Sequence, residues 1–337
     1  MTVVVAPGRV NLIGDHVDYV GGLALPCAIE LAVTATVTRA GDVVDLTSDA
    51  TAEHARFALG DARVAANAST WVRLVHAVVG ALHPATGVTG RLTTTLPIGS
   101  GLSSSAACTI ALCLAFGFNG DERALVLAAQ AAEQEATGVP CGTLDQLAIV
   151  HGRAGHALIV DAAALTADPV PVPSGVAIAV IPSGHHRELS DTPYAQRRAE
   201  AEAAVAAMGG VANATLADAE ALPDALLRRR ARHVITENTR VRAMADAFAA
   251  SDAPAAGALM LESHRSLRRD AEVSTHDLDS LVDALSSRAG VFGARLTGAG
   301  FGGSVVALVA ADAAAALAET FGGRVVTPSD GARVVAP

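Results

Sequence analysis

Residues 97–107, PIGSGLSSSAA, join a glycine-rich turn directly to the start of an apolar helix. Gly99 and Gly101 let the backbone come close to a ligand, and the serines that follow can cap a helix. The first amides of a helix lack partners and lie at the positive end of its dipole, so they bind phosphate readily. A capped helix after an ordinary tight turn is the alternative for these residues taken alone. The unbroken serine triplet before a wholly apolar helix favours the phosphate site.

Composition limits what kind of protein can carry this turn. A length of 337 residues fits about two domains, and 51% hydrophobic with 17% charged residues excludes a disordered chain. The formal net charge of −10 argues against nucleic acid as the main partner. The chain contains no lysine, which excludes a P-loop, since that motif needs a lysine after its glycines. An anion must therefore be bound by backbone amides, an arginine or a metal.

The expected location follows from what the sequence lacks. The first residues, MTVVVAPGRV, have no basic region and no small-residue cleavage site, so no signal peptide is predicted. No apolar run approaches about 20 residues, so no membrane span or membrane partner is expected. The four cysteines form no C-x-x-C pair, and we expect them to be free thiols. These features predict a cytoplasmic protein, and we expect a monomer rather than an obligate oligomer.

Strand and helix patterns alternate along both halves, which predicts an α+β protein in two layers. Strands are expected at 2–6, 23–39, 176–182 and 304–310, and helices at 70–83, 121–136, 192–208, 254–268 and 276–289, with further helices within 215–250. The stretch TADPVPVPSG, residues 166–175, is rich in proline and marks the expected boundary between two domains. We place the domains at residues 1–168 and 169–337.

Three further stretches carry chemistry. GRVNLIGDHVDYVGG, residues 8–22, crowds Asp15, His16 and Asp18 close to an arginine, and a surface turn would explain the aspartates but not that arginine. GVPCGTLDQ, residues 138–146, contains an aspartate that is either a helix cap or a base for a substrate hydroxyl. LTGAGFGGSVVALV, residues 296–309, is either a plain strand–loop–strand or a second surface that a ligand can approach closely.

In this order and at these separations, the glycine-rich stretches resemble the GHMP kinase superfamily, and within it the galactokinases. GRVNLIGDHVDYVGGLALPCAI is similar to their N-terminal signature, LPIGSGLSSSAA to their ATP loop and CGTLDQ to their catalytic-aspartate segment. The resemblance covers the chain from residue 4 to about 310. It implies a two-domain GHMP kinase fold, with an N-terminal domain like domain 2 of ribosomal protein S5 and a ferredoxin-like C-terminal domain. It also implies an active site in the cleft between the domains, where the phosphate of MgATP passes to the anomeric hydroxyl of galactose.

The resemblance assigns a role to each matching position. Asp145 and Arg9 match the catalytic pair, and Ser105 and Glu133 match the ligands of Mg²⁺. The sugar contacts match Asp15, His16, Asp18, Gly142 and Tyr194. The loop that cradles the ATP phosphates matches Gly99, Ser100, Gly101, Leu102, Ser103, Ser104 and Ser105. Sugar hydroxyls both donate and accept hydrogen bonds, and a cluster of carboxylates with an imidazole suits that task.

The signature departs from the usual galactokinase pattern, and this leaves the sugar open. Galactokinases generally have Glu where Asp15 stands, Thr where Val17 stands and Asn where Val20 stands. Because the family's Glu contacts the hydroxyl at C6, galacturonate, arabinose and N-acetylgalactosamine remain alternatives to galactose. A non-catalytic sugar sensor is a rival from another class, but Ser105 and Ala106, which such regulators lose in part, are present. A mevalonate- or homoserine-type kinase is disfavoured because those relatives lack the DHVDY-type cluster.

Overall fold

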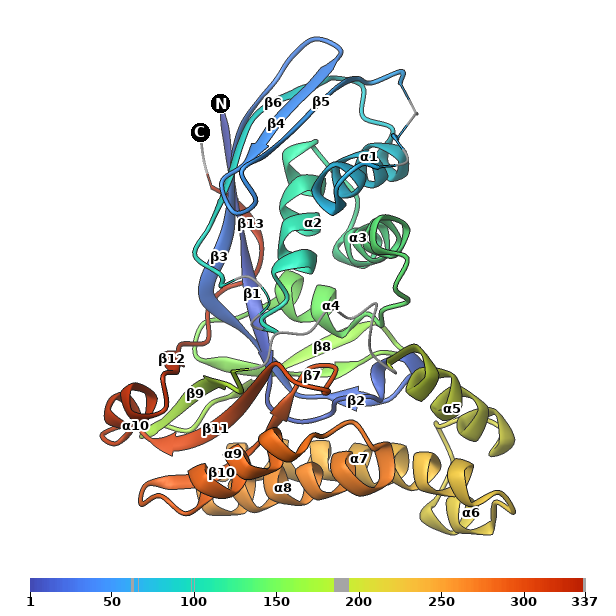
Figure 1. Ribbon diagram of the computed structural model, residues 1–337, viewed down its shortest axis with the longest axis vertical. Helices are drawn as coiled ribbons and strands as arrows, with labels where there is room; N and C mark the ends of the chain where they lie inside the picture. The colour runs from blue at the N-terminus through green and yellow to red at the C-terminus, as the bar shows by residue number, and fades with distance from the viewer. Residues whose placement is uncertain (62–63, 66, 98, 100, 185–193, 336–337) are drawn as a thin grey trace.

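Three β-sheets and ten α-helices organise the computed structural model, which describes residues 1–337 except 62–63, 66, 98, 100, 185–193 and 336–337 (Figure 1). Its strands are β1 (Thr2–Asn11), β2 (Leu23–Ala24), β3 (Pro26–Arg39), β4 (Val43–Ser48), β5 (Glu53–Ala58), β6 (Val88–Thr94), β7 (His156–Asp161), β8 (Thr166–Pro171), β9 (Val176–Pro182), β10 (Val291–Thr297), β11 (Ser304–Ala310), β12 (Arg324–Val326) and β13 (Arg333–Val335). Its α-helices are α1 (Thr70–Leu82), α2 (Ser104–Ala115), α3 (Glu122–Thr137), α4 (Leu144–His151), α5 (Tyr194–Ala207), α6 (Leu216–Ala221), α7 (Ala225–Ala249), α8 (Ala253–Ser266), α9 (His276–Ser286) and α10 (Ala314–Thr320). The described residues also include a 3₁₀ turn, η1 (Asp18–Val20), and a π-helical turn, η3 (Leu267–Ala271).

The N-terminal part of the chain forms a six-stranded sheet in the order β13-β1-β3-β6-β4-β5. Its neighbours pair antiparallel except for β4 and β6, which run parallel. Helices α1, α2 and α3 cover one side of this sheet (Figure 1). The register of β1 against β3 shifts between Pro7 and Arg9. Such a bulge re-aims the side chains beside it, and here it lies at the predicted catalytic arginine.

Local patterns predicted most of these elements. The apolar stripe at 70–83 is α1, where the Ser69 hydroxyl accepts the amide of Val72 and caps the helix. The strand expected at 176–182 is β9, with the same bounds. The two predictions are confirmed because both segments combine a clear period with a terminating residue.

The C-terminal part contains a four-stranded sheet in the order β10-β11-β9-β12. Helices α8 and α9 pack against β10, and the 25-residue helix α7 lies beside α8 (Figure 1). The core here gathers Leu267, Val273, Leu278, Leu296 and Val305, all fully buried. This layer supplies the rigid base for the turn between β10 and β11.

Strand β8 lies inside the proline-rich stretch 166–175 that we expect to mark the domain boundary. It pairs antiparallel with β7 over its whole length, in a small sheet of order β2-β7-β8. Pro169 and Pro171 are tolerated because β8 is an edge strand, where missing amide donors break no ladder. The division at residues 168 and 169 passes through this strand and stays a prediction.

The last strand returns to the first. β13 pairs antiparallel with β1, so the two ends of the chain lie side by side (Figure 1). Before it, the Ser329 amide donates to the Ala28 carbonyl at 3.0 Å, and the Ala332 amide donates to the Ile149 carbonyl at 2.8 Å. Residues from the C-terminal end thus complete the N-terminal sheet. In the described part of the chain, no helix has the length and apolar character needed to cross a bilayer.

Candidate active site

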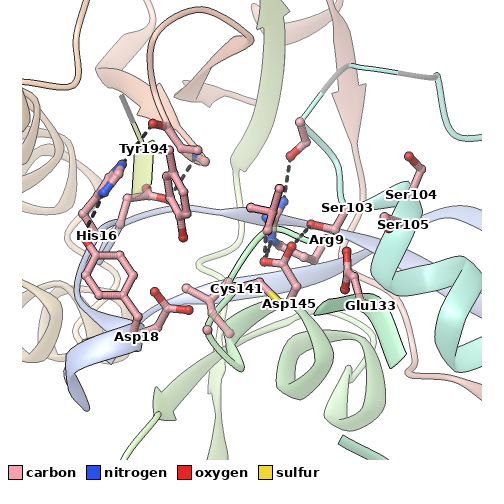
Figure 2. A pocket seen from close by; sticks show the side chains of 18 of the residues that line it. Arg9, His16, Asp18, Ser103, Ser104, Ser105, Glu133, Cys141, Asp145 and Tyr194 are labelled. Carbon is pink, nitrogen blue, oxygen red and sulfur yellow. Dashed lines mark hydrogen bonds and ion pairs between the residues drawn. The ribbon is translucent and has the colours of Figure 1, made fainter. Parts of the chain in front are cut away.

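A cavity of about 260 Å³ opens where β1, the turn after it, α4, α5 and the β10–β11 turn meet. Figure 2 shows Tyr194, His16 and Asp18 on one side, the serines at the start of α2 with Glu133 on the other, and the Arg9–Asp145 pair between them. The sequence-predicted residues that line it are Arg9, Asp15, His16, Asp18, Gly99, Gly101, Ser103, Ser104, Ser105, Glu133, Gly142, Asp145 and Tyr194. Ser100 lies outside the described residues, and Leu102 is buried beside the cavity rather than lining it.

Arg9 and Asp145 form the centre of the site. Asp145 Oδ1 accepts from Arg9 Nε at 2.7 Å and lies 2.6 Å from Arg9 Nη2. Arg9 Nη1 donates to the Gly101 carbonyl at 2.7 Å, and the Arg9 amide donates to the Leu102 carbonyl at 3.2 Å. The arginine therefore ties the start of α4 to the glycine turn. Its guanidinium is nearly buried, while the Asp145 side chain keeps 31% of its surface exposed to the cavity.

The glycine turn ends at a serine that faces the same carboxylate. Ser103 Oγ donates to Asp145 Oδ2 at 2.5 Å, so both carboxylate oxygens of Asp145 have partners. Gly99, Gly101 and Ser103 have φ angles of +72°, +78° and +58°, and this left-handed backbone curls the turn over the N-terminus of α2. The first amides of α2 face the cavity with the positive end of the helix dipole, which suits a phosphate.

Glu133 comes from α3 and lies at the serine side of the cavity. Its Oε2 accepts from Gln146 Nε2 at 2.7 Å, and the Ser105 hydroxyl also bonds to its carboxylate. Burial, and secondly the negative charge of Asp145, raise the pKa of Glu133 to about 7. A positive charge placed beside Glu133 and Asp145 would relieve this repulsion. Glu133 and Ser105 thus lie together at the N-terminus of α2, and their oxygen atoms are of the kind that Mg²⁺ prefers.

Asp18 lies at the opposite side, against the backbone of Gly142. A Cβ added to Gly142 would collide with the Asp18 carboxylate, so glycine lets this carboxylate lie directly against the backbone. Burial, and secondly the Asp145 carboxylate, raise the pKa of Asp18 to about 6, while the Leu144 amide opposes this shift. Asp18 therefore faces the cavity close to a second carboxylate, Asp145, and its own charge is poorly compensated. This arrangement suits a ligand that donates hydrogen bonds.

Asp15 and His16 line the same side, but the chain itself uses their polar atoms. Asp15 Oδ1 accepts the Gly298 amide at 3.0 Å, and Oδ2 lies 2.6 Å from Arg295 Nη2. His16 Nε2 lies 3.0 Å from the Ala299 carbonyl, which can only accept, so this nitrogen carries the proton. His16 Nδ1 then accepts from the hydroxyl of Tyr19 at 3.0 Å. Both residues fasten the N-terminal signature to the β10–β11 turn.

The two tyrosines of the chain meet at this side of the cavity. Their rings, Tyr19 and Tyr194, lie edge to face at 6.2 Å, and Tyr194 also lies 5.6 Å from the His16 ring. Tyr19 was not among the predicted site residues. Its place inside the DHVDY stretch, together with the scarcity of tyrosine in the chain, is the signal that would have found it. Cys141, Leu144, Gly298 and Ala299 also line the cavity without having been predicted.

The fold and this cavity define a class of kinase. Residues 70–153 match the GHMP kinases N terminal domain, and residues 244–323 match the GHMP kinases C terminal domain. The glycine turn, Glu133 and Asp145 all fall in or beside the first of these regions. The chain has the GHMP kinase fold and belongs to that superfamily.

Closer relatives narrow the class. Residues 2–39 match the galactokinase galactose-binding signature. The chain is 41% identical over 329 residues to a galactokinase of Chloroflexus aggregans, covering 91% of this chain and 83% of that one. It is 40% identical over 333 residues to a galactokinase of Mycobacterium bovis, with 94% and 91% covered. The crystal structure of Lactococcus lactis galactokinase complexed with galactose superposes with a TM-score of 0.90 at 30% identity, covering 98% and 94%. Within the GHMP kinases, the chain belongs to the galactokinase family.

Proposed function

We propose that this chain transfers the γ-phosphate of ATP to the C1 hydroxyl of galactose, which gives galactose 1-phosphate and ADP. The observation that carries the proposal is the position of the Arg9–Asp145 pair between the two sides of one cavity. A sugar on the side of Asp18 and Tyr194 and a nucleotide on the side of the serines would meet at Asp145. Phosphoryl transfer depends mainly on such positioning and on charge neutralisation.

Asp145 is the proposed base. A C1 oxygen that attacks the γ-phosphorus must lose its proton, and Asp145 accepts it as the bond between the γ-phosphorus and the leaving ADP oxygen breaks. Arg9 places both Nε and Nη2 against Oδ1, whereas Ser103 occupies only one lone pair of Oδ2, so the second lone pair of Oδ2 remains for the sugar hydroxyl. Arg9 also provides fixed positive charge close to the transferred group.

The phosphates are proposed to bind at the glycine turn and the start of α2. In a lysine-free chain, the backbone amides there and Arg9 supply the positive field. Glu133 and Ser105 would hold Mg²⁺, an ion that takes one or two protein oxygens and completes its shell with water and substrate phosphates. The described residues hold no cluster of three or more His, Cys, Asp or Glu suited to a metal, which agrees with an ion that the nucleotide brings. When bound, Mg²⁺ would neutralise charge on the β- and γ-phosphates.

The charge of the cavity bears on the choice of sugar. Its described lining contains the carboxylates of Asp15, Asp18, Glu133 and Asp145 but the guanidinium of Arg9 alone. Arg295 is fully buried behind Asp15 and does not reach the cavity. A uronate would bring a further negative charge to the side of Asp15 and Asp18, so we favour a neutral sugar over galacturonate. Arabinose and N-acetylgalactosamine are neutral and are tested directly.

A panel of free sugars in an assay that couples ADP release to a colour change tests the proposal. We expect galactose to give the highest kcat/KM, arabinose and N-acetylgalactosamine to give lower values, and galacturonate to give almost none. The Asp145→Asn variant should lose about 100-fold or more in kcat, because a positioned base contributes 10²–10⁴-fold. Its affinity for ATP should stay within about twofold, since Asp145 is not part of the glycine turn.

Two results would contradict the proposal. ATP-independent sugar binding with no ADP release from any sugar would indicate a sugar sensor. A normal kcat in Asp145→Asn would remove the base. Ser329→Ala, a change at a half-buried tail position that does not line the cavity, serves as the control for purification and assay.

We also propose a cellular location and an oligomeric state for the enzyme. The four cysteines (Cys27, Cys108, Cys113 and Cys141) are free thiols, as the sequence predicted. Burial raises the pKa of Cys141, which lines the cavity, to about 12, so this thiol is poorly reactive. Free thiols support a reducing, cytoplasmic location. We also propose a monomer, which size-exclusion chromatography with light scattering tests.

A further inference from the structure

The Gly14–Asp15 segment of the N-terminal signature is held from the C-terminal half by buried charge. We propose that Arg295, which does not line the cavity, is a positioning residue for sugar recognition. The inference rests on the proposed function, because it assigns the sugar to the side of the cavity that this segment forms. It adds a residue that neither the sequence patterns nor the cavity lining indicated.

The first contact is between Arg295 and Asp15. Arg295 Nη2 lies 2.6 Å from Asp15 Oδ2, and the Gly298 amide donates to Asp15 Oδ1 at 3.0 Å. Both partners come from β10 and the turn that follows it. The backbone of Asp15 is held as well, because its carbonyl accepts from His233 Nε2 at 3.0 Å. Asp15 is therefore fixed at three atoms by residues from the C-terminal half.

The second contact reaches the residue before. Glu237 Oε1 accepts the Gly14 amide at 3.0 Å and the Ser263 hydroxyl at 2.5 Å. The same oxygen lies 4.0 Å from Arg295 Nη2, while Oε2 lies 2.7 Å from Arg240 Nη2. Two carboxylates and two guanidinium groups thus form one balanced cluster of Asp15, Glu237, Arg240 and Arg295.

Because the cluster is buried, its positive and negative charges must compensate each other within the protein. Arg295 and Glu237 are completely buried, and Asp15 is 5% exposed. Among the described residues, Arg295 Nε and Nη1 have no hydrogen-bond acceptor, so charge compensation comes from Asp15 and Glu237. Removing one member of a buried ion pair leaves an uncompensated charge and is strongly unfavourable. The cluster therefore has one arrangement that satisfies its charges, and that arrangement fixes the backbone at Gly14 and Asp15.

The fixed segment forms the sugar side and not the ATP side. Asp15 leads directly into His16, which reaches the Ala299 carbonyl, and Gly298 and Ala299 both line the cavity. None of the four charged residues of the cluster bonds to Arg9, Asp145 or the glycine turn in the described structure. A change at Arg295 should move the wall between His16 and the β10–β11 turn and leave the nucleotide side in place.

Steady-state kinetics of Arg295→Met and Arg295→Lys test this split. We expect Arg295→Met to raise the KM for galactose at least tenfold while the KM for ATP stays within twofold. Arg295→Lys keeps the charge but loses the planar fork, so it should recover part of the galactose affinity. Isothermal calorimetry of galactose without nucleotide should show the same order of affinities, because it reports the sugar side alone.

Arg230→Met is the matched control. Arg230 is also a buried arginine of the C-terminal half, paired with Glu200 and Glu272, and none of the three lines the cavity. Its loss should lower the melting temperature without a selective rise in the KM for galactose. An equal rise in this control would show that sugar affinity follows general stability, and it would overturn the inference.

Other outcomes are equally decisive. A normal galactose KM in Arg295→Met, or equal changes in the KM for galactose and for ATP, contradicts the positioning role. If Arg295→Met does not fold, Arg295→Lys and Glu237→Gln answer the same question with smaller perturbations. The proposed function fails separately, namely when the unmodified enzyme phosphorylates no sugar of the panel, whereas the positioning role is judged on galactose binding relative to the unmodified enzyme.

Discussion

Each carboxylate of the cavity has a different environment, and this determines what it can do. Asp145 is paired with Arg9, Asp15 is paired with Arg295, and Asp18 and Glu133 carry raised pKa values of about 6 and about 7. The first two each have a guanidinium group as an ion-pair partner. The other two are partly protonated near neutrality until a hydrogen-bond donor or a cation compensates them.

Glu133→Gln tests this difference through stability. The native protein keeps a proton on Glu133 that the unfolded chain releases at lower pH, so this contribution to stability is lost as the pH rises from about 4.5 to about 7. Glutamine cannot ionise and avoids the loss. Without ligands, the variant should be more stable than the unmodified protein at pH 8, by at most about 3 kcal/mol, and equally stable near pH 5.

Thermal unfolding followed by circular dichroism across this pH range measures the effect. Glu135→Gln, on the exposed face of the same helix, is the control and should show no pH-dependent gain. A constant difference between Glu133→Gln and the unmodified protein at all pH values would rule out the raised pKa as its cause.

Sequence patterns predicted the residues of the cavity better than their partners. Arg9, Asp18 and Asp145 stand in short motifs with a recognisable polar pattern, whereas Glu133 has no such pattern in its helix and was expected only from the family resemblance. The partners of Asp15 cannot be recognised in the linear sequence. Gly298 lies 283 positions away, and Arg295 lies inside a buried strand, where an arginine has no local pattern. Long-range pairing is set by how the sheets pack, and a single sequence does not display it.

At the scale of elements, the start of α4 brings two functions together. Gly142 precedes the helix and touches Asp18, while Asp145 lies in its first turn. A short helix thus places the proposed base and the backbone surface behind Asp18 within one rigid unit. The edge strand β8 was not expected as a strand, because prolines are as typical of a domain boundary as of an edge strand.

Gly142→Ala tests the close approach to Asp18. The added methyl group would push aside the flexible carboxylate of Asp18, so the helix should form while the Asp18 side chain moves. Losing a hydrogen bond to a charged group costs about 1.5–3 kcal/mol, which predicts a 10- to 100-fold rise in the KM for galactose. The KM for ATP should not change.

Gly80→Ala is the control for this substitution. Gly80 lies within α1 with open space where its Cβ would be, so alanine there should leave both KM values unaltered. A galactose KM within twofold of normal in Gly142→Ala would show that Asp18 tolerates the methyl group.

At the scale of the whole molecule, the chain crosses between its two halves several times. The signature after β1 is fastened to the β10–β11 turn, and the tail after β12 returns to the N-terminal sheet. The tail also supports α4, since the Gly331 amide donates to the Gly152 carbonyl at 2.8 Å and the Ala332 amide to that of Ile149. The two halves therefore hold each other's functional segments.

Deleting residues 329–337 tests the structural weight of the tail. Three backbone hydrogen bonds from Ser329, Gly331 and Ala332 are lost with the β13 pairing, at about 1 kcal/mol each. We expect a loss of more than about 3 kcal/mol in the free energy of unfolding, measured by denaturant titration, because the β13–β1 hydrogen bonds are lost as well. We also expect a lower kcat, because α4 carries Asp145. Val334→Thr keeps the backbone and an exposed side chain, so it should be neutral. Unchanged stability on deletion would mean that β1 does not need its outer neighbour.

The fastening of Asp15 to Gly298 and Arg295 also fixes an order of events during synthesis. A chain emerging from the ribosome presents Arg9, the glycine turn and Asp145 when less than half of it has been made. The segment around Asp15 gains its partners only when residues 295–299 have been made, and β1 gains its outer neighbour only when β13 has been made. An incomplete chain can thus gather its phosphate-side residues while its sugar side is still missing a partner. The segment around Asp15 therefore reaches its final packing only after β10 and the turn that follows it have been made.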